Sequence, residues 1–329
     1  MRILLSRLDR IGDLVLSTPA IASVRGSWPR AHVTLVCSSY NAAVVERNRD
    51  VDEVVVLESG TTPAQMGARF RGACDIAIAL APCTPDFFLV GATRAPQRIG
   101  YTYRRRYIAR VTARLFLTHL LISEADPELC ERRPTYRVRH EVDQVLDLVA
   151  RAGGAQLLHD LVVTTTADDR AAVAHVPSGG IVVHLAPRWL RNGSTLASFI
   201  ALLNRLRSFG LPVVVTHGTD VGEAVPAVVC AGAADCIVGG MSFGQWAAVF
   251  GAARLIVTVD TGATHVASAM QRPTVVLFEH RYFNLNSQEW APYHVAAALL
   301  RKPADESETA LAASRESIVT AVESLLTYA

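Results

Sequence analysis

Three loops of the sequence carry residues that could bind or transfer a charged group. The first is "SRLDRIGDL", in which Gly12 and Asp13 closely follow an apolar run at residues 2–7. A glycine-rich phosphate loop would present bare backbone N–H groups at such a point. The carboxylate of Asp13 would instead repel an anion. It can cap the following helix, or it can act as a general base that accepts a proton from a hydroxyl.

The second loop is "VDTGATH", at the end of another hydrophobic run. Asp260, Thr261 and Gly262 form a turn into an alanine-rich segment whose first helical turn holds Thr264 and His265. Free N–H groups and the helix dipole favour an anion at this point, and Gly262 permits close backbone approach. An Asp or Thr N-cap is the ordinary alternative. The density of polar groups favours a diphosphate site.

The third loop, "APRWLRNGS", places two arginines between an expected strand and an expected helix. Arg188 and Arg191 could bind phosphate through bidentate hydrogen bonds, or they could be solvated loop residues. His217 and Gly218 end the next hydrophobic run, "PVVVTHG". In open α/β sheets ligands bind beyond the carboxyl ends of the strands. We therefore predict that these residues bind the same ligand as the second loop.

A basic run, "RIGYTYRRRYIARVTAR", spans residues 98–114. Arg104, Arg105 and Arg106 lie among three tyrosines. The usual interpretation is a solvated face or loop. The functional interpretation is a binding site for an anionic acceptor or for an anionic membrane surface.

The elements that must position these residues follow a βαβ pattern. Short hydrophobic runs at residues 2–7, 32–37, 51–57 and 75–80 alternate with helix-like segments, and the alternation restarts at residue 180 after a polar stretch. This pattern predicts two doubly wound α/β domains with parallel sheets. We expect the first domain at residues 1–165, the second at 166–310, and a final helix at 311–329 that packs back toward the first domain.

Composition excludes several classes of protein. The net charge is +2 over 329 residues, which argues against a nucleic-acid partner. The opening apolar run is interrupted by charges and predicts neither a signal peptide nor a membrane span. Six cysteines show no zinc-site spacing. These observations predict a cytoplasmic enzyme that can visit the inner membrane peripherally.

Two of these stretches resemble the signatures of glycosyltransferase family 9, the ADP-heptose:lipopolysaccharide heptosyltransferases. Matching residues of the N-terminal signature are Gly12, Asp13, Thr18, Pro19 and Ala20. Matching residues of the second signature are Asp260, Thr261, Gly262, His265, Ala267, Ala269 and Pro273. Both signatures occur in the family's order, and the resemblance covers nearly the whole chain.

The resemblance implies a GT-B fold, with two Rossmann-like domains facing across a cleft. It implies an inverting transfer that uses a nucleotide-sugar donor and neither a metal nor another cofactor. Asp13 would be the catalytic base, with Gly12 and Arg104–Arg106 on the acceptor side. The donor would be held by Asp260, Thr261, Gly262, Thr264, His265, Arg188, Arg191, His217 and Gly218.

The sequence departs from the family pattern in two loops. Arg191 stands where the family has a lysine, and Asn192, Gly193 and Ser194 replace the Trp-Pro that normally follows. After Phe278 the family's Phe-Gly-x-Thr is replaced by Glu279 and His280. Asp9 also stands where the family usually has a small polar residue. The departure after Phe278 leaves the donor's sugar and base open. Asp9 could be a solvated loop residue or a contact to an unusual acceptor.

Three functional hypotheses remain at this point. The first is transfer of a sugar, above all heptose from ADP-heptose, to a hydroxyl of a glycan or lipopolysaccharide-core-type acceptor. The second is a nucleotide-sugar-binding sensor or scaffold that has lost catalysis. The third is a family enzyme that uses another donor sugar on a natural-product or protein acceptor.

Overall fold

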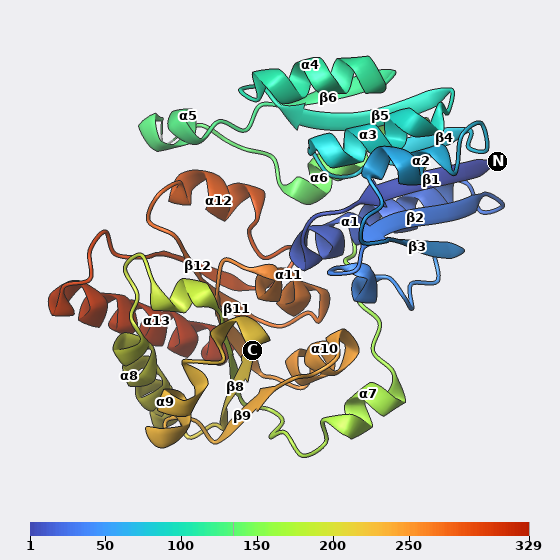
Figure 1. Cartoon of the computed structure of the whole chain (residues 1–329). Helices are drawn as coiled ribbons and strands as arrows, with labels where there is room; N and C mark the ends of the chain where they lie inside the picture. The colour runs from blue at the N-terminus through green and yellow to red at the C-terminus, as the bar shows by residue number, and fades with distance from the viewer. Residues whose placement is uncertain (134, 329) are drawn as a thin grey trace. The chain divides into compact units, whose positions relative to one another are not determined.

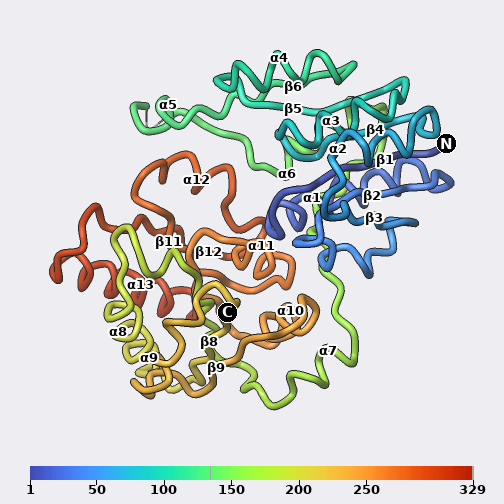
Figure 2. The backbone as a smooth tube through the Cα atoms, viewed as in Figure 1, coloured from blue at the N-terminus to red at the C-terminus, as the bar shows by residue number. Residues whose placement is uncertain are grey.

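The chain forms two compact units. The computed structural model describes residues 1–133 and 135–328, and the chain divides into Met1–Thr164 and Thr165–Ala329. An extended segment between helices α6 and α7 joins the units (Figure 2). Its backbone N–H groups at Leu158 and Val162 bond the hydroxyls of Ser23 and Thr18. This part of the connection therefore belongs structurally to the first unit.

The first unit is built on one parallel six-stranded sheet with the order β3-β2-β1-β4-β5-β6 (Figure 1). Its interior strands are apolar runs, as expected for a sheet buried on both faces. The strands are β1 (Arg2–Arg7), β2 (His32–Ser38), β3 (Glu53–Leu57), β4 (Ile76–Ala79), β5 (Gln97–Tyr103) and β6 (His119–Ser123).

Helices cover the first sheet in two groups. Helices α1 and α6 pack on each other, and α3 packs on both α2 and α4. The bounds are α1 (Ile11–Ser27), α2 (Pro63–Ala68), α3 (Thr84–Thr93), α4 (Tyr107–Phe116), α5 (Pro127–Arg132) and α6 (Glu141–Arg151). A short 3-10 turn, η1 (Ala42–Val44), follows β2.

Helix α1 continues through Pro19, although proline normally interrupts a helix. Pro19 has no N–H to donate to the carbonyl of Val15 four residues earlier. The hydroxyl of Thr18 donates to that carbonyl at 2.7 Å instead. The first signature therefore carries its own compensation for the proline.

The second unit repeats the same strand order. Its sheet runs β12-β11-β10-β7-β8-β9, again all parallel. The strands are β7 (Ile181–Leu185), β8 (Val213–His217), β9 (Cys236–Gly239), β10 (Leu255–Val259), β11 (Thr274–Phe278) and β12 (Ala297–Arg301). Read from β9, this is the Rossmann order 3-2-1-4-5-6, which the first unit also has.

The helices of the second unit also form two groups. Helices α10 and α11 pack together, and α8 packs on α13. Figure 1 shows α8, α9 and α13 gathered on one side of this sheet. The bounds are α7 (Ala167–Ala172), α8 (Leu196–Leu206), α9 (Val225–Cys230), α10 (Phe243–Gly251), α11 (Gly262–Ala269), α12 (Phe283–Glu289) and α13 (Glu308–Tyr328), with 3-10 turns η2 (Pro187–Leu190), η3 (Arg207–Phe209) and η4 (Thr219–Val221).

The last helix, α13, belongs to the second unit, since Ile318 and Val322 are buried in that unit's core beside residues of α8 and β10. Burial of these two side chains against the second sheet fixes the helix there. The expected packing of the segment 311–329 toward the first domain stays a prediction.

The basic run at 98–114 is not a loop. Its first part is β5, whose Gly100 and Tyr101 are buried between β4 and β6. Residues 104–106 form the turn, and α4 follows. Only the turn and the outer face of α4 remain solvated.

Both sheets have a topological switch point between their first and fourth strands. These are the β1/β4 pair in the first unit and the β7/β10 pair in the second. Ligands of open α/β sheets bind in the crevice at the carboxyl ends of such pairs. Asp13 follows β1, while Arg188 follows β7 and Asp260 follows β10, so the sequence candidates lie at these points.

Candidate functional site

Asp13 lies in the first turn of α1, directly beyond the carboxyl end of β1. The preceding cap residue is Arg10, whose side chain makes no capping hydrogen bond. The Asp13 side chain is 23% exposed. Burial raises the pKa of Asp13 to about 7; Arg7 opposes this shift, and Asp9 and Glu141 add to it. A partly accessible carboxyl with this pKa is suited to general base chemistry near neutral pH.

A buried arginine holds the surroundings of Asp13. Arg7 ends β1 and is 1% exposed. Its guanidinium lies 2.8 Å from Asp9, 3.1 Å from Glu141 and 3.6 Å from Asp13. The hydroxyl of Tyr101 also donates to Glu141 at 2.5 Å. The unusual Asp9 is thereby explained as a partner of Arg7.

Sequence reasoning missed Arg7, Glu141 and Tyr101 as members of this site. Arg7 lies in the first signature, so its charge beside two aspartates was an available signal. Glu141 comes from α6 and Tyr101 from β5, far away in the sequence. Only the strand order brings them together.

A fourth carboxyl, Asp86, lies on the other side of the switch point. It belongs to α3, which follows β4, and is 1% exposed. Ser6 of β1 donates to its Oδ1 at 2.5 Å, while its buried Oδ2 makes no hydrogen bond. Burial raises the pKa of Asp86 to about 7 despite the Ser6 hydrogen bond. Four carboxyls therefore surround the one buried guanidinium of Arg7.

At the second unit's switch point, an ion pair joins the loops that follow β7 and β10. The guanidinium of Arg188 lies 2.6 Å from the Asp260 carboxylate and also bonds the Asp260 backbone carbonyl. This pair connects the residues that follow β7 and β10. Both residues were predicted to bind the donor, and the structure places them in direct contact.

Lys302 fixes the loop that carries the two arginines. It is the chain's only lysine, it follows β12, and it is 1% exposed. Its ammonium donates to the carbonyls of Arg188 and Arg191 and to Glu279 at 3.1 Å. Burial lowers the pKa of Lys302. A compact ammonium suits this convergence of carbonyls better than a planar guanidinium.

The turn after Arg191 has a backbone conformation that excludes proline at two positions. Asn192 and Gly193 both have left-handed backbone conformations, with φ of 54° and 80°. A Cβ at Gly193 would lie 2.4 Å from the carbonyl oxygen of Pro303. Proline cannot adopt such a φ angle. The exposed side chain of Arg191 extends from this tightly turned loop.

The second signature forms the start of α11 and the turn before it. Thr261 is the cap residue, and its hydroxyl donates to the Val259 carbonyl and accepts no hydrogen bond from a helix N–H. Thr264 is fully buried with its hydroxyl directed to the same carbonyl. Thr264 therefore supports the turn between strand and helix, and the donor contact that we expect of it stays a prediction. His265 is also buried, in the first turn after Gly262.

His217 and Gly218 lie beyond the carboxyl end of β8. The His217 ring bonds the Gly218 carbonyl at 2.9 Å and packs against Gly239. One strand away, His184 bonds Thr216 at 3.0 Å and lies against Trp246. Burial lowers the pKa of His184 to about 4, so this ring is neutral at physiological pH.

Residues 188–316 match the family model of glycosyltransferase family 9 (heptosyltransferase). The resemblance to glycosyltransferase family 9 is confirmed. The matched stretch lies in the second unit and contains the Arg188–Asp260 pair, the start of α11 and Lys302. It also confirms the predicted enzyme class, a glycosyltransferase. No curated protein matches the chain.

Solved structures share the fold over the full length of the chain. A glycosyl transferase family 9 structure from Veillonella parvula has 22% identity and a TM-score of 0.78, covering 100% of this chain and 97% of that chain. E. coli ADP-heptose lps heptosyltransferase II has 17% identity and a TM-score of 0.75, covering 100% and 99%. E. coli heptosyltransferase WaaC with ADP has 17% identity and a TM-score of 0.69, covering 99% and 100%. The predicted GT-B architecture of two Rossmann-like units is thereby confirmed.

The arginine turn at residues 104–106 is partly neutralised by nearby carboxylates of the first unit. Arg104 pairs with Glu124, and Arg105 lies 2.6 Å from Asp126 and 2.8 Å from Glu128. Arg106 stacks over Tyr103. The turn follows β5, at the same sheet edge as Gly12 and Asp13, because all six strands are parallel. No contact joins the arginines to Asp13 among the interactions described.

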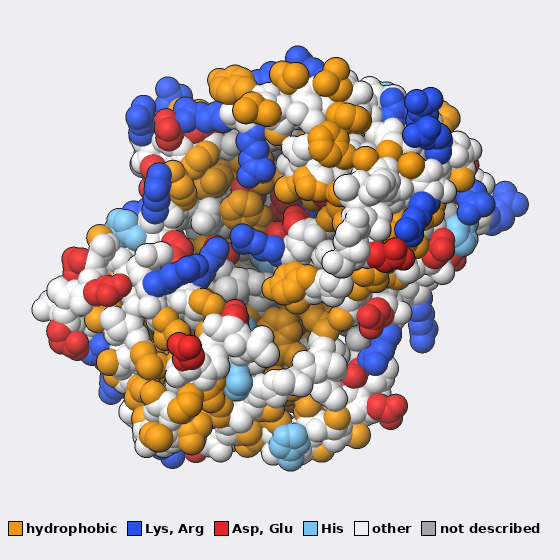
Figure 3. Space-filling view, in the orientation of Figure 1, with side chains coloured by type: hydrophobic (Ala, Val, Ile, Leu, Met, Phe, Trp, Pro, Cys, Tyr) orange, Lys and Arg blue, Asp and Glu red, His pale blue; other side chains and the backbone are white. Residues whose placement is uncertain are grey.

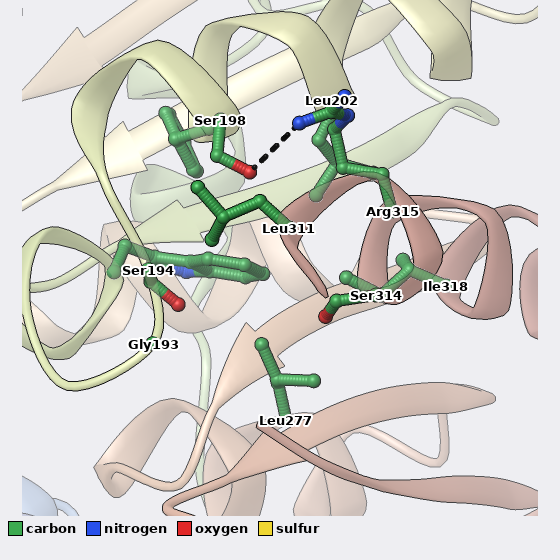
Figure 4. A pocket seen from close by; sticks show the side chains of 11 residues that line it. Gly193, Ser194, Ser198, Leu202, Leu277, Leu311, Ser314, Arg315 and Ile318 are labelled. Atoms are coloured by element: carbon green, nitrogen blue, oxygen red, sulfur yellow. Dashed lines mark hydrogen bonds between the residues drawn. The ribbon is translucent and has the colours of Figure 1, made fainter. Parts of the chain in front are cut away.

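Two pockets lie elsewhere in the units, and one of them borders the candidate site through Tyr101. One, between α8 and α13, has a cavity volume of about 10 Å³ and is crossed by a 3.3 Å hydrogen bond from Arg315 to Ser198 (Figure 4). It has room for one water at most. The other, of about 160 Å³, opens beside β6 and α6 in the first unit and is lined in part by Tyr101, Arg137 and Gln144. Sequence reasoning identified neither pocket.

Proposed function

We propose that this protein is an inverting, metal-independent glycosyltransferase that moves heptose from ADP-heptose to a hydroxyl of a glycan or lipopolysaccharide-core-type acceptor. The observation that carries the proposal is the family 9 (heptosyltransferase) match over residues 188–316. Two structures with the same fold are an ADP-heptose lps heptosyltransferase and a heptosyltransferase with ADP, and both support adenine as the donor's base.

In this proposal the second unit binds the donor. The start of α11 offers free N–H groups and the positive end of its dipole to the diphosphate. The exposed guanidinium of Arg191 supplies further positive charge. Both would stabilise the diphosphate as it leaves, which is when its negative charge increases. The pair of Arg188 and Asp260 holds the two loops that flank this position.

The first unit then activates the acceptor. Asp13 takes the proton of the acceptor hydroxyl, and the oxygen attacks the anomeric carbon from the face opposite the diphosphate. The new glycosidic bond forms as the bond to the diphosphate breaks, so the configuration inverts. Arg7 is a positioning residue, because its contacts orient Asp13 and bias its charge. The residues of the turn at 104–106 remain proposed acceptor contacts, and a cytoplasmic location remains part of the proposal.

Acceptor-dependent release of ADP tests this function. The wild-type chain is incubated with ADP-heptose and a deacylated lipopolysaccharide-core oligosaccharide, with and without EDTA. We expect release in both conditions, and loss of release in Asp13→Asn with donor binding retained. General base catalysis contributes roughly 10²–10⁴-fold. Full turnover by Asp13→Asn would reject the base, and EDTA-sensitive turnover would reject the metal-free mechanism.

A nucleotide-sugar sensor is the second candidate, and one observation favours it. Two predicted donor contacts, Arg188 and Asp260, bond each other, and the neighbouring Glu279 pairs with Lys302. Binding of ADP-heptose without either acceptor-dependent release or slow donor hydrolysis would support the sensor. A thermal-shift panel of ADP-, UDP-, GDP- and dTDP-sugars covers the third candidate, a different donor. If only a nucleotide sugar with a base other than adenine stabilised the protein, that nucleotide sugar would replace ADP-heptose in the proposal.

A further inference from the structure

Helix α4 exposes a row of large apolar side chains. Ile108 is 85% exposed, Leu115 75%, Tyr107 70% and Val111 62%. These are four of the ten large hydrophobic side chains that are exposed among the described residues. Positions 107, 108, 111 and 115 fall on one face of a helix. Figure 3 shows hydrophobic side chains gathered over α4.

This apolar face is not needed to hold α4 on its own unit. The opposite face already packs there, with Ala113 fully buried and Ala109 and Phe116 against the same core. The Phe116 ring also meets Phe88 edge-on, with 4.9 Å between centroids. The exposed row is therefore a second apolar face that the fold leaves in water.

Positive charge borders this face. Arg110 and Arg114 lie on one flank of the row, and the helix contains no acidic residue. Arg110 is half-buried, and its guanidinium donates to the Arg104 carbonyl at 3.1 Å and lies over Tyr107, 5.8 Å from the ring centroid. Arg114 is exposed and makes no ion pair or hydrogen bond within the described part of the chain. The nearby carboxylates of Glu124 and Asp126 are held by Arg104 and Arg105.

We propose that α4 docks this protein on an anionic membrane surface, with Ile108, Val111 and Leu115 in the lipid interface and Arg110 and Arg114 at the phosphate groups. An apolar face bordered by arginine is the pattern of helices that lie in the plane of a membrane. Clustered arginines are attracted to the negative lipid surface. Within the described residues no helix is long and apolar enough to cross a membrane, so surface docking is the contact available.

A second copy of the chain fits this face less well. Ten residues of helix are about 15 Å long, which offers much less than the roughly 800 Å² per partner of a stable interface. A two-fold interface through the row would also bring the arginine flanks of both copies together. Charge complementarity thus selects an anionic surface.

The proposal does not depend on sugar transfer, and its test uses vesicles rather than turnover. Full-length protein is sedimented with vesicles of phosphatidylcholine alone, and with vesicles of equal parts phosphatidylcholine and phosphatidylglycerol. We expect binding only to the anionic vesicles, and weaker binding at higher salt. Ile108→Ser/Leu115→Ser should reduce the partition coefficient at least about tenfold, and Arg114→Gln should reduce it on anionic vesicles.

Matched controls separate docking from general effects. Val229→Ser removes an exposed apolar side chain from the second unit, and Arg151→Gln removes an exposed arginine from α6. Both should bind as wild type, and all variants should keep the wild-type melting temperature. Turnover of a soluble acceptor without vesicles should also stay unchanged in the α4 variants.

Three outcomes would overturn the proposal. The first is no binding of the wild type to anionic vesicles. The second is unchanged binding by Ile108→Ser/Leu115→Ser. The third is concentration-dependent dimerisation of the wild type that this double variant abolishes, which would assign the face to a second copy. Failure of sugar transfer with intact vesicle binding would reject the proposed function alone.

Discussion

At the scale of single residues, the first unit concentrates negative charge where a base is needed. Asp9, Asp13, Asp86 and Glu141 lie around Arg7, which is the one buried cation among them. One guanidinium cannot neutralise four carboxylates in a medium of low dielectric constant. Protons are therefore retained on some of them at neutral pH, and the raised pKa values of Asp13 and Asp86 express this.

The pH dependence of turnover follows from Asp13. A base works only when deprotonated, and burial raises the pKa of Asp13 to about 7. We expect kcat/KM for acceptor to rise with pH through about 7 and to level off above it. A rate that is flat from pH 5 to pH 8, which are roughly the limits of a useful profile, would contradict this assignment. Tm values at each pH control for unfolding.

Removing Arg7 should move that profile. Its positive charge lowers the pKa of Asp13, so Arg7→Gln should shift the midpoint to higher pH. Removal also leaves the buried Glu141 without its ion pair, at a cost of about 3–5 kcal/mol in unfolding free energy. Urea unfolding at pH 7 measures this cost.

Arg7→Lys is the matched control for Arg7→Gln, because it keeps the charge but loses the planar fork that contacts Asp9, Asp13 and Glu141. Its pH midpoint should lie between those of the wild type and Arg7→Gln. A midpoint that stays at the wild-type value in both variants would show that Arg7 has only a structural role.

Asp86 makes the stability of the first unit depend on pH. Its pKa is about 7 in the folded protein, above the ordinary value of 3.8. Between these two pH values the folded state holds more protons than the unfolded state, so stability falls as pH rises from about 4 to about 7. Asp86→Asn keeps an oxygen for Ser6 and should flatten part of this slope. Urea midpoints at pH 5 and pH 8 give the comparison; equal slopes in variant and wild type would contradict it.

At the scale of elements, the parallel strands bring distant residues to one sheet edge. Arg188 and Asp260 are 72 positions apart, yet they bond because β7 and β10 are neighbours. Ser6 and Asp86 are joined in the same way across β1 and β4. The two units thus build their candidate sites by one topological device.

Substitution of Lys302 tests whether nucleotide binding requires the fixed position of the loop that carries Arg188 and Arg191. Lys302→Met removes the donor that holds the carbonyls of Arg188 and Arg191 and leaves Glu279 without its cation. We expect the unfolding free energy to fall by about 3 kcal/mol and ADP to bind at least about tenfold more weakly. Isothermal titration with ADP measures the binding.

Lys302→Arg is the control that keeps the charge in this pocket. It should bind ADP with intermediate affinity, because its planar fork fits the pocket less well. Wild-type affinity in Lys302→Met would show that nucleotide binding does not require this loop geometry.

Sequence patterns predicted the elements that are apolar and short. The runs at 2–7, 32–37 and 75–80 gave β1, β2 and β4 nearly to the residue, since buried parallel strands must be continuous hydrophobic segments. β5 was missed because "QRIGYTY" is polar at its start and contains a glycine. Its burial comes from its neighbours β4 and β6, which no local window contains.

The candidate site was predictable to a similar degree. Asp13, Arg188 and Asp260 were found because each follows a strand in a recognisable loop. Glu141 was missed because it opens a helix 128 positions after Asp13, and its role depends on the path of α6. Lys302 could have been found as the chain's only lysine, although its burial could not.

At the scale of the whole molecule, the two units have separate cores. The two hydrophobic cores share no residue. The core of the second unit includes Val183 and Leu203, and the core of the first includes Leu4 and Phe87. Each unit also contains its own complete six-stranded sheet, and the two units have nearly the same number of residues. A ligand held by one unit should therefore stabilise that unit more than the other.

Nucleotide binding should accordingly raise the midpoint temperature of one unfolding transition rather than of both. ADP at about 100 times its dissociation constant adds about 2.7 kcal/mol to the unit that binds it. By the proposed function this is the second unit, whose transition can be assigned with Leu203→Ala, a core change that costs about 2–5 kcal/mol. Leu4→Ala assigns the first unit in the same way. Differential scanning calorimetry with and without ADP measures both.

The single lysine provides an independent measurement of the same event. Lys302 is buried in the second unit, so an amine reagent can modify its side chain only when that unit opens. ADP should slow this modification in proportion to the added stability, while modification of the exposed N-terminal amine continues unchanged. Two results would contradict this assignment: an ADP-dependent rise only in the unfolding temperature that Leu4→Ala lowers, and an unchanged rate of Lys302 labelling. Together they would show that the nucleotide binds the first unit, and the donor and acceptor sides would be exchanged.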